Sequence, residues 1–208
     1  NPSGHFMAKA DVLRLAKWCE KRGVNLLLDE SFVDFADVTV DNSLLHNDIL
    51  ESYPHLMVMK SISKSYGVPG LRLGVFASSD KALIARIRKE VSIWNINSFA
   101  EFYLQIYCKY ENDYKRACEK FIAERETFYE ELKSIPYLRV FPSKANYFMC
   151  EVIDKYTSAE LTQRLIDNDV LISNCGLKRN MSGRQLIRLA VRSREDNSRL
   201  VNILKALA

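Results

Sequence analysis

The chain has 208 residues, of which 48% are hydrophobic and 27% are charged, so it has enough apolar side chains for the core of one large domain or two small ones. Its net charge of +4 comes from 30 basic and 26 acidic residues spread along the chain. No block of like charge and no basic–aromatic stripe indicates binding to nucleic acid. No apolar run reaches the roughly 20 residues that span a membrane.

The cysteines and histidines favour a reduced, cytoplasmic setting without a metal site. Five cysteines are odd in number and never occur in Cys-x-x-Cys spacing, and His5, His46 and His55 have no metal-ligand spacing. No signal peptide is visible. The chain opens on Asn1-Pro2-Ser3-Gly4, which is turn chemistry with no strand before it. We therefore expect it to be a fragment of a longer polypeptide.

The first half alternates helical and strand patterns. Residues 8–22 carry apolar side chains at helical spacing, and Gly23 follows as a stop signal. Residues 24–28 form a short apolar run that ends in Asp29-Glu30, which is typical of a buried parallel strand with polar groups at its carboxyl end. Further strands are predicted at 56–59 and 71–77, and a helix at 80–91. This alternation predicts an α/β layer with a largely parallel sheet.

The second half begins with two long helical patterns, at 98–110 and 114–133. Thr157-x-x-Glu160 and Ser193-x-x-Asp196 resemble capping boxes and predict helices at about 158–168 and 194–207. Short strands are predicted between these helices, at 138–141, 147–152, 170–173 and 186–191. We expect residues 1–110 to belong to a larger α/β domain and residues 111–208 to form a small α+β domain.

One stretch carries several groups that suit chemistry, S-I-S-K-S-Y-G-V-P-G-L-R-L-G at 61–74. Ser61, Ser63 and Arg72 are the hydroxyl and guanidinium donors that a phosphate group requires. Lys64 has an amine that can form a Schiff base with a carbonyl. Taken alone, however, the stretch favours an exposed loop with a solvated lysine, because most matches to short motifs are accidental.

Asp29 is the second candidate. A carboxylate at the end of a buried strand is a suitable partner for a cationic ring nitrogen, such as the pyridinium of pyridoxal phosphate. The alternative is an ordinary helix cap or a solvated strand end, and the residue by itself does not decide between them. Glu30 beside it is not expected to form a carboxylate pair, because neighbouring strand residues point to opposite faces.

Four separated motifs together give a specific resemblance, and two weaker ones support it. The four are N-P-S-G (1–4), L-L-L-D-E-S-F-V-D-F (26–35), the stretch at 61–74, and I-R-L-A-V-R-S-R-E-D-N (187–197); the weaker two are W-N-I-N-S-F-A (94–100) and S-K-A-N-Y-F (143–148). In order and spacing they resemble the C-terminal portion of fold-type I pyridoxal-phosphate enzymes of the class I/II aminotransferase superfamily. Histidinol-phosphate aminotransferases and threonine-phosphate decarboxylases are the most similar.

The resemblance implies a fold and a cofactor. The fold is part of the large pyridoxal-phosphate-transferase domain, a mostly parallel sheet with helices, followed by a small α+β domain. The cofactor is pyridoxal 5′-phosphate. Lys64 then corresponds to the Schiff-base lysine, Asp29 to the partner of the pyridine nitrogen, and Asn1 to the asparagine that binds the phenolic oxygen.

The remaining roles concern the cofactor phosphate and the substrate. Ser61, Ser63 and Arg72 match the residues that hold the phosphate, with Ser63 the weakest match. Arg188 matches the arginine that binds the substrate α-carboxylate. These assignments imply that Lys64 transfers the proton between the substrate Cα and the cofactor.

The chain departs from the family pattern in three ways. Phe32 occupies the place where many aminotransferases have a tyrosine that donates to the phenolic oxygen; decarboxylase-like relatives tend to carry phenylalanine there. Ser173 stands where relatives with phosphorylated substrates often have arginine, and Lys178 or Arg179 would have to compensate. The N-terminal part of the large domain is missing, so we expect an uncovered sheet edge and apolar face, and a chain that is inactive alone.

These observations favour a pyridoxal-phosphate-dependent aminotransferase that acts on an amino acid and a keto acid. A decarboxylase of the threonine-phosphate decarboxylase type is the first alternative. A non-catalytic fragment that retains the fold is the second. The resemblance also implies a homodimer.

Overall fold

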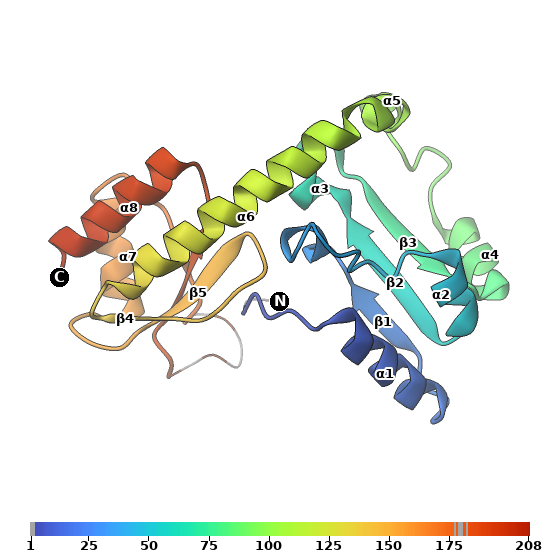
Figure 1. Ribbon diagram of the computed structural model, residues 1–208, viewed down its shortest axis with the longest axis horizontal. Helices are drawn as coiled ribbons and strands as arrows, with labels where there is room; N and C mark the ends of the chain where they lie inside the picture. Colours follow the sequence, from blue (N-terminus) through green and yellow to red (C-terminus); the bar gives the residue numbers. More distant parts are fainter. Residues whose placement is uncertain (1–2, 177, 179–180, 182) are drawn as a thin grey trace. The chain divides into compact units, whose positions relative to one another are not determined.

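The computed structural model describes residues 3–176, 178, 181 and 183–208. They form two compact units, shown with the order of elements in Figure 1. The first unit comprises Met7–Glu119; the second comprises Lys120–Ala208 together with residues 3–6. The boundary between the units falls within helix α6 (Glu111–Lys133). The division at residue 110 that we expected from the sequence stays a prediction.

The first unit contains a three-stranded sheet in the order β1-β2-β3. β1 (Leu26–Asp29) pairs parallel with β2 (Leu56–Ser61), and β2 pairs antiparallel with β3 (Gly74–Ser78). The sheet is mixed, which differs from the largely parallel arrangement expected. The cause is the connection from β2 to β3, which holds a single-turn helix, α3 (Ile62–Ser65), and a 3-10 turn, η2 (Pro69–Leu71), in place of a crossover helix.

One face of this sheet is covered and the other is open. Leu56 and Val58 of β2 are buried against Val12 of helix α1 (Lys9–Glu20). Leu44 of a loop and Leu50 of helix α2 (Asn47–Ser52) belong to the same cluster. The opposite face includes Leu27, which is 53% exposed, together with exposed Met59 and Phe76. An uncovered apolar face was expected from the sequence. The other elements of the unit are η1 (Val33–Phe35), α4 (Lys81–Glu90), α5 (Ser98–Tyr107) and η3 (Cys108–Tyr110).

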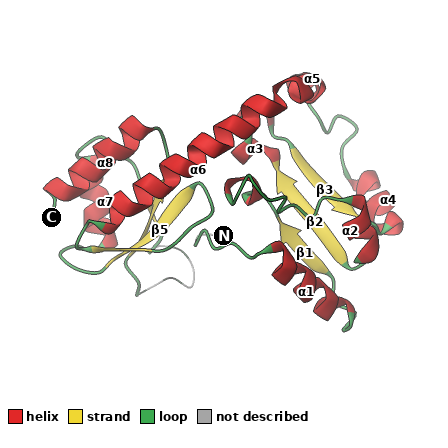
Figure 2. Cartoon of the chain, in the orientation of Figure 1, coloured by secondary structure: helices red, strands yellow, loops and turns green. Residues whose placement is uncertain are grey.

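The second unit is a small antiparallel α+β structure. Its sheet has the order β4-β5-β7-β6, with β4 at Leu138–Val140, β5 at Tyr147–Val152, β7 at Leu186–Ala190 and β6 at Ser173–Asn174. Helices α7 (Ser158–Ile166) and α8 (Arg194–Ala206) lie beside it (Figure 2). Phe128 of α6 and Phe148 of β5 pack edge to face in its core, with ring centres 6.0 Å apart.

Both helix starts predicted by capping patterns are confirmed. The Thr157 hydroxyl accepts from the Glu160 N–H at 3.2 Å, and the Glu160 carboxylate accepts from the Thr157 N–H at 2.8 Å. The Ser193 hydroxyl accepts from the Asp196 N–H at 3.2 Å. These bonds satisfy backbone donors that have no partner inside the helix.

Two predicted strands differ from the structure. The strand expected at 71–77 begins at Gly74, because Arg72 has a left-handed backbone that interrupts an extended chain. The strand expected at 170–173 is reduced to β6, because Asp169 is left-handed and the Val170 N–H donates to Leu165 at the end of α7. Among the described residues, no helix is long and apolar enough to cross a membrane.

Candidate cofactor site at the ends of β1 and β2

The carboxyl ends of β1 and β2 lie together because the two strands are parallel neighbours, with Asp29 paired to Met59. The Ser31 hydroxyl accepts a hydrogen bond from the Ser61 N–H at 3.0 Å and so joins the two strand ends. The Asp29 carboxylate accepts from the Ser31 N–H at 2.9 Å, while its side chain remains exposed. Asp29 is thus a fixed, solvent-accessible carboxylate at the carboxyl ends of the strands, and this edge of the sheet is where ligands of open α/β sheets bind.

Lys64 lies at the same edge. It belongs to α3, so it occupies a helical turn in place of the irregular loop expected from the sequence. Its exposed side chain places Nζ 4.7 Å from the centre of the Phe32 ring. The structure therefore brings Lys64 together with the Asp29–Phe32 turn.

The candidate phosphate ligands have different environments. Ser61 ends β2 and is partly buried, whereas Ser63 is buried and its hydroxyl donates to the Leu73 carbonyl oxygen at 3.4 Å. Arg72 is exposed, and its guanidinium donates to the Pro69 carbonyl oxygen at 3.2 Å. The hydroxyl of Ser63 is thus engaged by the backbone, and its role at a phosphate stays a prediction.

Arg72 has a strained backbone. Its φ of 57° lies in the left-handed region, which is uncommon for any residue other than glycine. The preceding turn is held by Asn97, whose side-chain amide donates to the Leu71 carbonyl oxygen at 3.1 Å and whose oxygen caps α5 by accepting from Ala100 at 3.0 Å. Strain of this kind, maintained by its surroundings, is frequent at functional sites.

A partly buried ion pair contacts the Lys64 turn. Asp34 Oδ1 is 2.7 Å from Lys60 Nζ, and Asp34 Oδ2 accepts from the Ser65 hydroxyl at 2.7 Å. Lys60 is only 8% exposed. Sequence reasoning missed this group because its members are 26 and 31 residues apart and match no short motif.

Glu30 anchors the loop that follows β1. It is 4% exposed and accepts from the Leu44 N–H at 2.6 Å and from the Ser43 hydroxyl at 2.7 Å. Burial raises the pKa of Glu30 above its ordinary value of 4.5, against the opposing effect of these two hydrogen bonds. Its burial contrasts with the exposure of Asp29, as the alternation of strand side chains requires.

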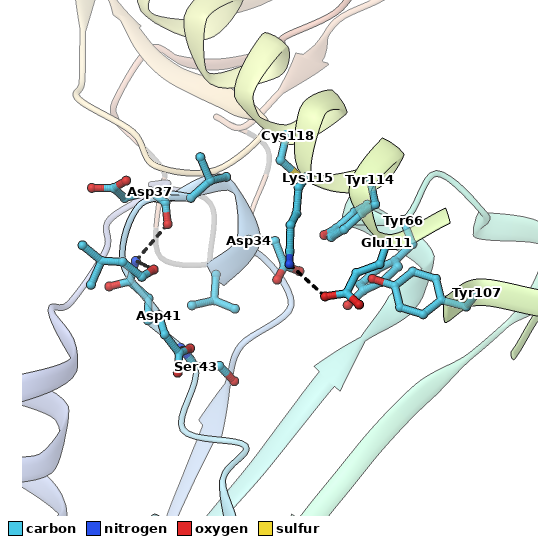
Figure 3. Close-up of a pocket in the computed structure, with 14 residues that line it drawn as sticks. Asp34, Asp37, Asp41, Ser43, Tyr66, Tyr107, Glu111, Tyr114, Lys115 and Cys118 are labelled. Carbon is cyan, nitrogen blue, oxygen red and sulfur yellow. Dashed lines mark hydrogen bonds and ion pairs between the residues drawn. The ribbon is translucent and has the colours of Figure 1, made fainter. Parts of the chain in front are cut away.

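A cavity of about 280 Å³ adjoins Asp34 (Figure 3). Tyr66, Tyr107 and Tyr114 group on one side of it, with the rings of Tyr66 and Tyr114 stacked 4.3 Å apart. Burial raises the pKa of both Tyr66 and Tyr114. The ring cluster forms an apolar wall next to the ion pair.

Arg188 belongs to the second unit. It lies in β7, directly across from Ser173 of β6 and Met149 of β5, with its guanidinium carbon 4.9 Å from the centre of the Tyr147 ring. Ser173, one of the departures from the family pattern seen in the sequence, is therefore the immediate neighbour of Arg188. Lys178 is exposed. Asn1 and Arg179 lie outside the described residues.

Comparisons with known proteins identify the family of the chain. Residues 1–204 match the family of aminotransferases class I and II. The threonine-phosphate decarboxylase of Salmonella typhimurium is 31% identical over 99% of this chain and 54% of its own length. Two solved structures superpose over the whole chain. The histidinol-phosphate aminotransferase of Clostridium acetobutylicum has a TM-score of 0.87 and 27% identity, and 61% of that chain is covered. A decarboxylase of Sulfurospirillum multivorans has a TM-score of 0.86 and 28% identity, and 59% of that chain is covered.

The chain spans about half the length of the curated relatives it matches. The fold class expected from the sequence is confirmed, since the structural neighbours have the pyridoxal-phosphate-transferase fold and are covered in part. The chain therefore belongs to the aminotransferase class I and II family, whose cofactor is pyridoxal 5′-phosphate.

Proposed function

We propose that the full-length protein is an aminotransferase that acts on an amino acid and uses Lys64 to bind pyridoxal phosphate covalently. One observation carries the proposal. The parallel pairing of β1 and β2 places the Asp29–Phe32 turn and Lys64 at one sheet edge, with Lys64 Nζ 4.7 Å from the Phe32 ring centre.

The residues at this edge fit the cofactor. An exposed amine, a carboxylate oriented by a backbone N–H, a serine at the end of a strand and a guanidinium are the donors and acceptors that the aldehyde, the ring nitrogen and the phosphate require. When bound, pyridoxal phosphate supplies an electrophilic aldehyde and a ring that accepts negative charge from the substrate Cα.

Each residue has a defined task in this proposal. Asp29 holds the proton on the ring nitrogen, and the Ser31 N–H keeps its carboxylate in place. Ser61 and Arg72 bind the phosphate. Lys64 Nζ removes the proton from the substrate Cα once the amine is free. Arg188 presents two N–H groups to the substrate α-carboxylate.

A decarboxylase is the second candidate. The 31% identical threonine-phosphate decarboxylase and the presence of Phe32 favour it. Both reactions would use the same residues and differ in which bond at the substrate Cα is broken. Arg188 would hold the substrate α-carboxylate in either reaction, and the orientation it gives that carboxylate would decide between loss of the proton and loss of CO2.

Product analysis of the full-length protein distinguishes the candidates. The protein is incubated with pyridoxal phosphate, a keto acid acceptor and a panel of amino acids that includes phosphoserine and phosphothreonine. Formation of the matching keto acid, abolished by Lys64→Ala, is the expected result. Release of CO2 without keto acid would replace the proposal with decarboxylation. If neither product forms while the cofactor is bound at Lys64, the non-catalytic alternative is the one that remains.

We also propose that the full-length protein is a homodimer. The segment before α5 and the first turn of that helix carry exposed apolar side chains, with Ile93 94% and Trp94 91% exposed, and Phe99 also exposed. Exposed apolar patches of this kind are typical of protein interfaces. Sedimentation equilibrium is expected to give twice the chain mass; a monomer at micromolar concentration would contradict this proposal.

A further inference from the structure

The carboxylate of Asp34 joins two segments on either side of Lys64. One oxygen is 2.7 Å from the ammonium of Lys60, near the end of β2. The other accepts from the hydroxyl of Ser65, the residue directly after Lys64, also at 2.7 Å. A single side chain therefore contacts both the strand that leads into the Lys64 turn and the turn itself.

Burial makes this arrangement rigid. The side chain of Lys60 is 9% exposed and that of Asp34 is 18% exposed, so each charge requires the other as a partner. The ammonium of Lys60 also lies 5.7 Å from the centre of the Tyr66 ring. The buried carboxylate of Glu30 also lies near the pair, since both Lys60 and Asp34 influence its pKa. Breaking the ion pair would leave the charge of Lys60 buried without this partner, which is costly. The two side chains are therefore held in this geometry.

The turn that carries Lys64 depends on contacts outside itself. α3 is a single helical turn, and a helix this short does not persist in water by its own hydrogen bonds. On one side of Lys64, the Ile62 N–H and the Ser63 hydroxyl both donate to the Leu73 carbonyl oxygen, at 3.1 and 3.4 Å. On the other side, Ser65 is bound to Asp34. Lys64 is thus held between two anchoring points.

We propose that Asp34 is a positioning residue for the reaction: through Ser65 it fixes the turn that carries Lys64, and through Lys60 it fixes that turn to β2. The inference rests on the proposed function of Lys64. Asp34 acts through its two partners, neither of which is assigned to the cofactor or the substrate.

The first test uses Ser65→Ala, which removes one of the two contacts and leaves the ion pair intact. In the cofactor-free full-length protein, amide hydrogen exchange of residues 62–66 is expected to accelerate about tenfold, because the lost hydrogen bond is to a charged group. Ser52→Ala is the matched control, since its hydroxyl donates to the Asp48 carbonyl oxygen within a helix away from the site. The control is expected to exchange at residues 62–66 like the wild type.

The loaded protein provides a second readout. Ser65→Ala is expected to change the visible circular dichroism of the bound cofactor and to lower kcat about tenfold with KM nearly unchanged, because the amine is displaced while the substrate contacts remain. A purely structural role for Ser65 would lower the unfolding temperature and leave the circular dichroism and kcat at wild-type values. That outcome would overturn the inference.

A double variant separates positioning from stability. Asp34→Ala alone leaves Lys60 buried without a partner, so it is expected to fold poorly. Asp34→Ala combined with Lys60→Met removes both charges, and is expected to unfold near the wild-type temperature with the rapid exchange of Ser65→Ala. Wild-type exchange in the folded double variant would contradict the inference. Failure of wild-type Lys64 to bind pyridoxal phosphate would instead refute the proposed function, and the exchange result would stand separately.

Discussion

The ammonium group of Lys64 lies 4.7 Å from the centre of the Phe32 ring, within the range of a cation–π contact. The two residues are in the segments that follow β1 and β2, and the parallel pairing of these strands brings them together. In the free protein, the face of the Phe32 ring therefore holds the Lys64 side chain beside the ends of β1 and β2. This contact does not require the hydroxyl of a tyrosine.

Replacing Phe32 is expected to strengthen cofactor binding, because its ring stabilises the free lysine that the cofactor must engage. Phe32→Leu removes the ring contact, worth about 0.5–1 kcal/mol at an exposed site, and so raises the affinity for pyridoxal phosphate about two- to fivefold. Titration of the full-length protein, followed by the visible absorbance of the bound cofactor, measures the change. Phe76→Leu, which alters an exposed phenylalanine of β3, is the control. Equal affinity of Phe32→Leu and wild type would show that the ring contact contributes nothing.

Arg72 offers a comparison of binding and strain. Arg72→Gly and Arg72→Ala both remove the guanidinium and are expected to lower cofactor affinity at least tenfold, because a charged hydrogen bond to the phosphate is lost. They are expected to differ in stability. Glycine adopts a φ of 57° without strain, so Arg72→Gly should exceed Arg72→Ala by about 1 kcal/mol in free energy of unfolding. Cofactor titration and urea unfolding test both parts; wild-type affinity in Arg72→Gly would exclude a phosphate role.

Glu30 predicts a dependence of stability on pH. Its folded-state pKa is raised above 4.5, chiefly by burial, so the folded protein binds the proton more tightly than the unfolded chain. The contribution of Glu30 is therefore fully present below about pH 4.5 and is lost as pH rises through the raised pKa. The free energy of unfolding of wild type minus that of Glu30→Gln should fall as pH rises above about 4.5. A difference that stays constant or grows with pH contradicts this account.

Gly4 is expected to tolerate no side chain. Its φ is +71°, and an added Cβ would overlap the hydroxyl of Ser143. Gly4→Ala should therefore destabilise the second unit by about 1–3 kcal/mol. Gly23→Ala is a matched control, because Gly23 has a similar φ of +63° with no atom within 4 Å of the added Cβ. Urea unfolding should show a larger loss for Gly4→Ala; equal losses would mean that only backbone strain matters.

Local signals in the sequence predicted much of the fold. The starts of α7 and α8 follow from Thr157 and Ser193, because capping bonds join residues only three positions apart. The end of β1 at Asp29 follows from the abrupt change from apolar to acidic residues. The interruption before β3 was not predicted, because the left-handed backbone of Arg72 is imposed by its surroundings and contradicts the preference of the residue.

The sequence predicts the chemical groups of the candidate site, and it gives no signal for the residues that support them. Lys64 and Asp29 belong to recognisable motifs, and the structure places their segments at one edge. Asp34, Lys60 and Ser65 carry no motif, because their relationship exists only after β1 and β2 have paired. Buried polar contacts between distant segments depend on tertiary packing, so a single sequence gives no direct signal for them.

The most direct test of the central claim is to identify the lysine that binds pyridoxal phosphate. The full-length protein is loaded with the cofactor, reduced with borohydride, digested and analysed by mass spectrometry. The account predicts one modified peptide, with the adduct on Lys64, and none in the Lys64→Ala variant. An adduct on Lys60 or another lysine, or no adduct in the wild type, would contradict it.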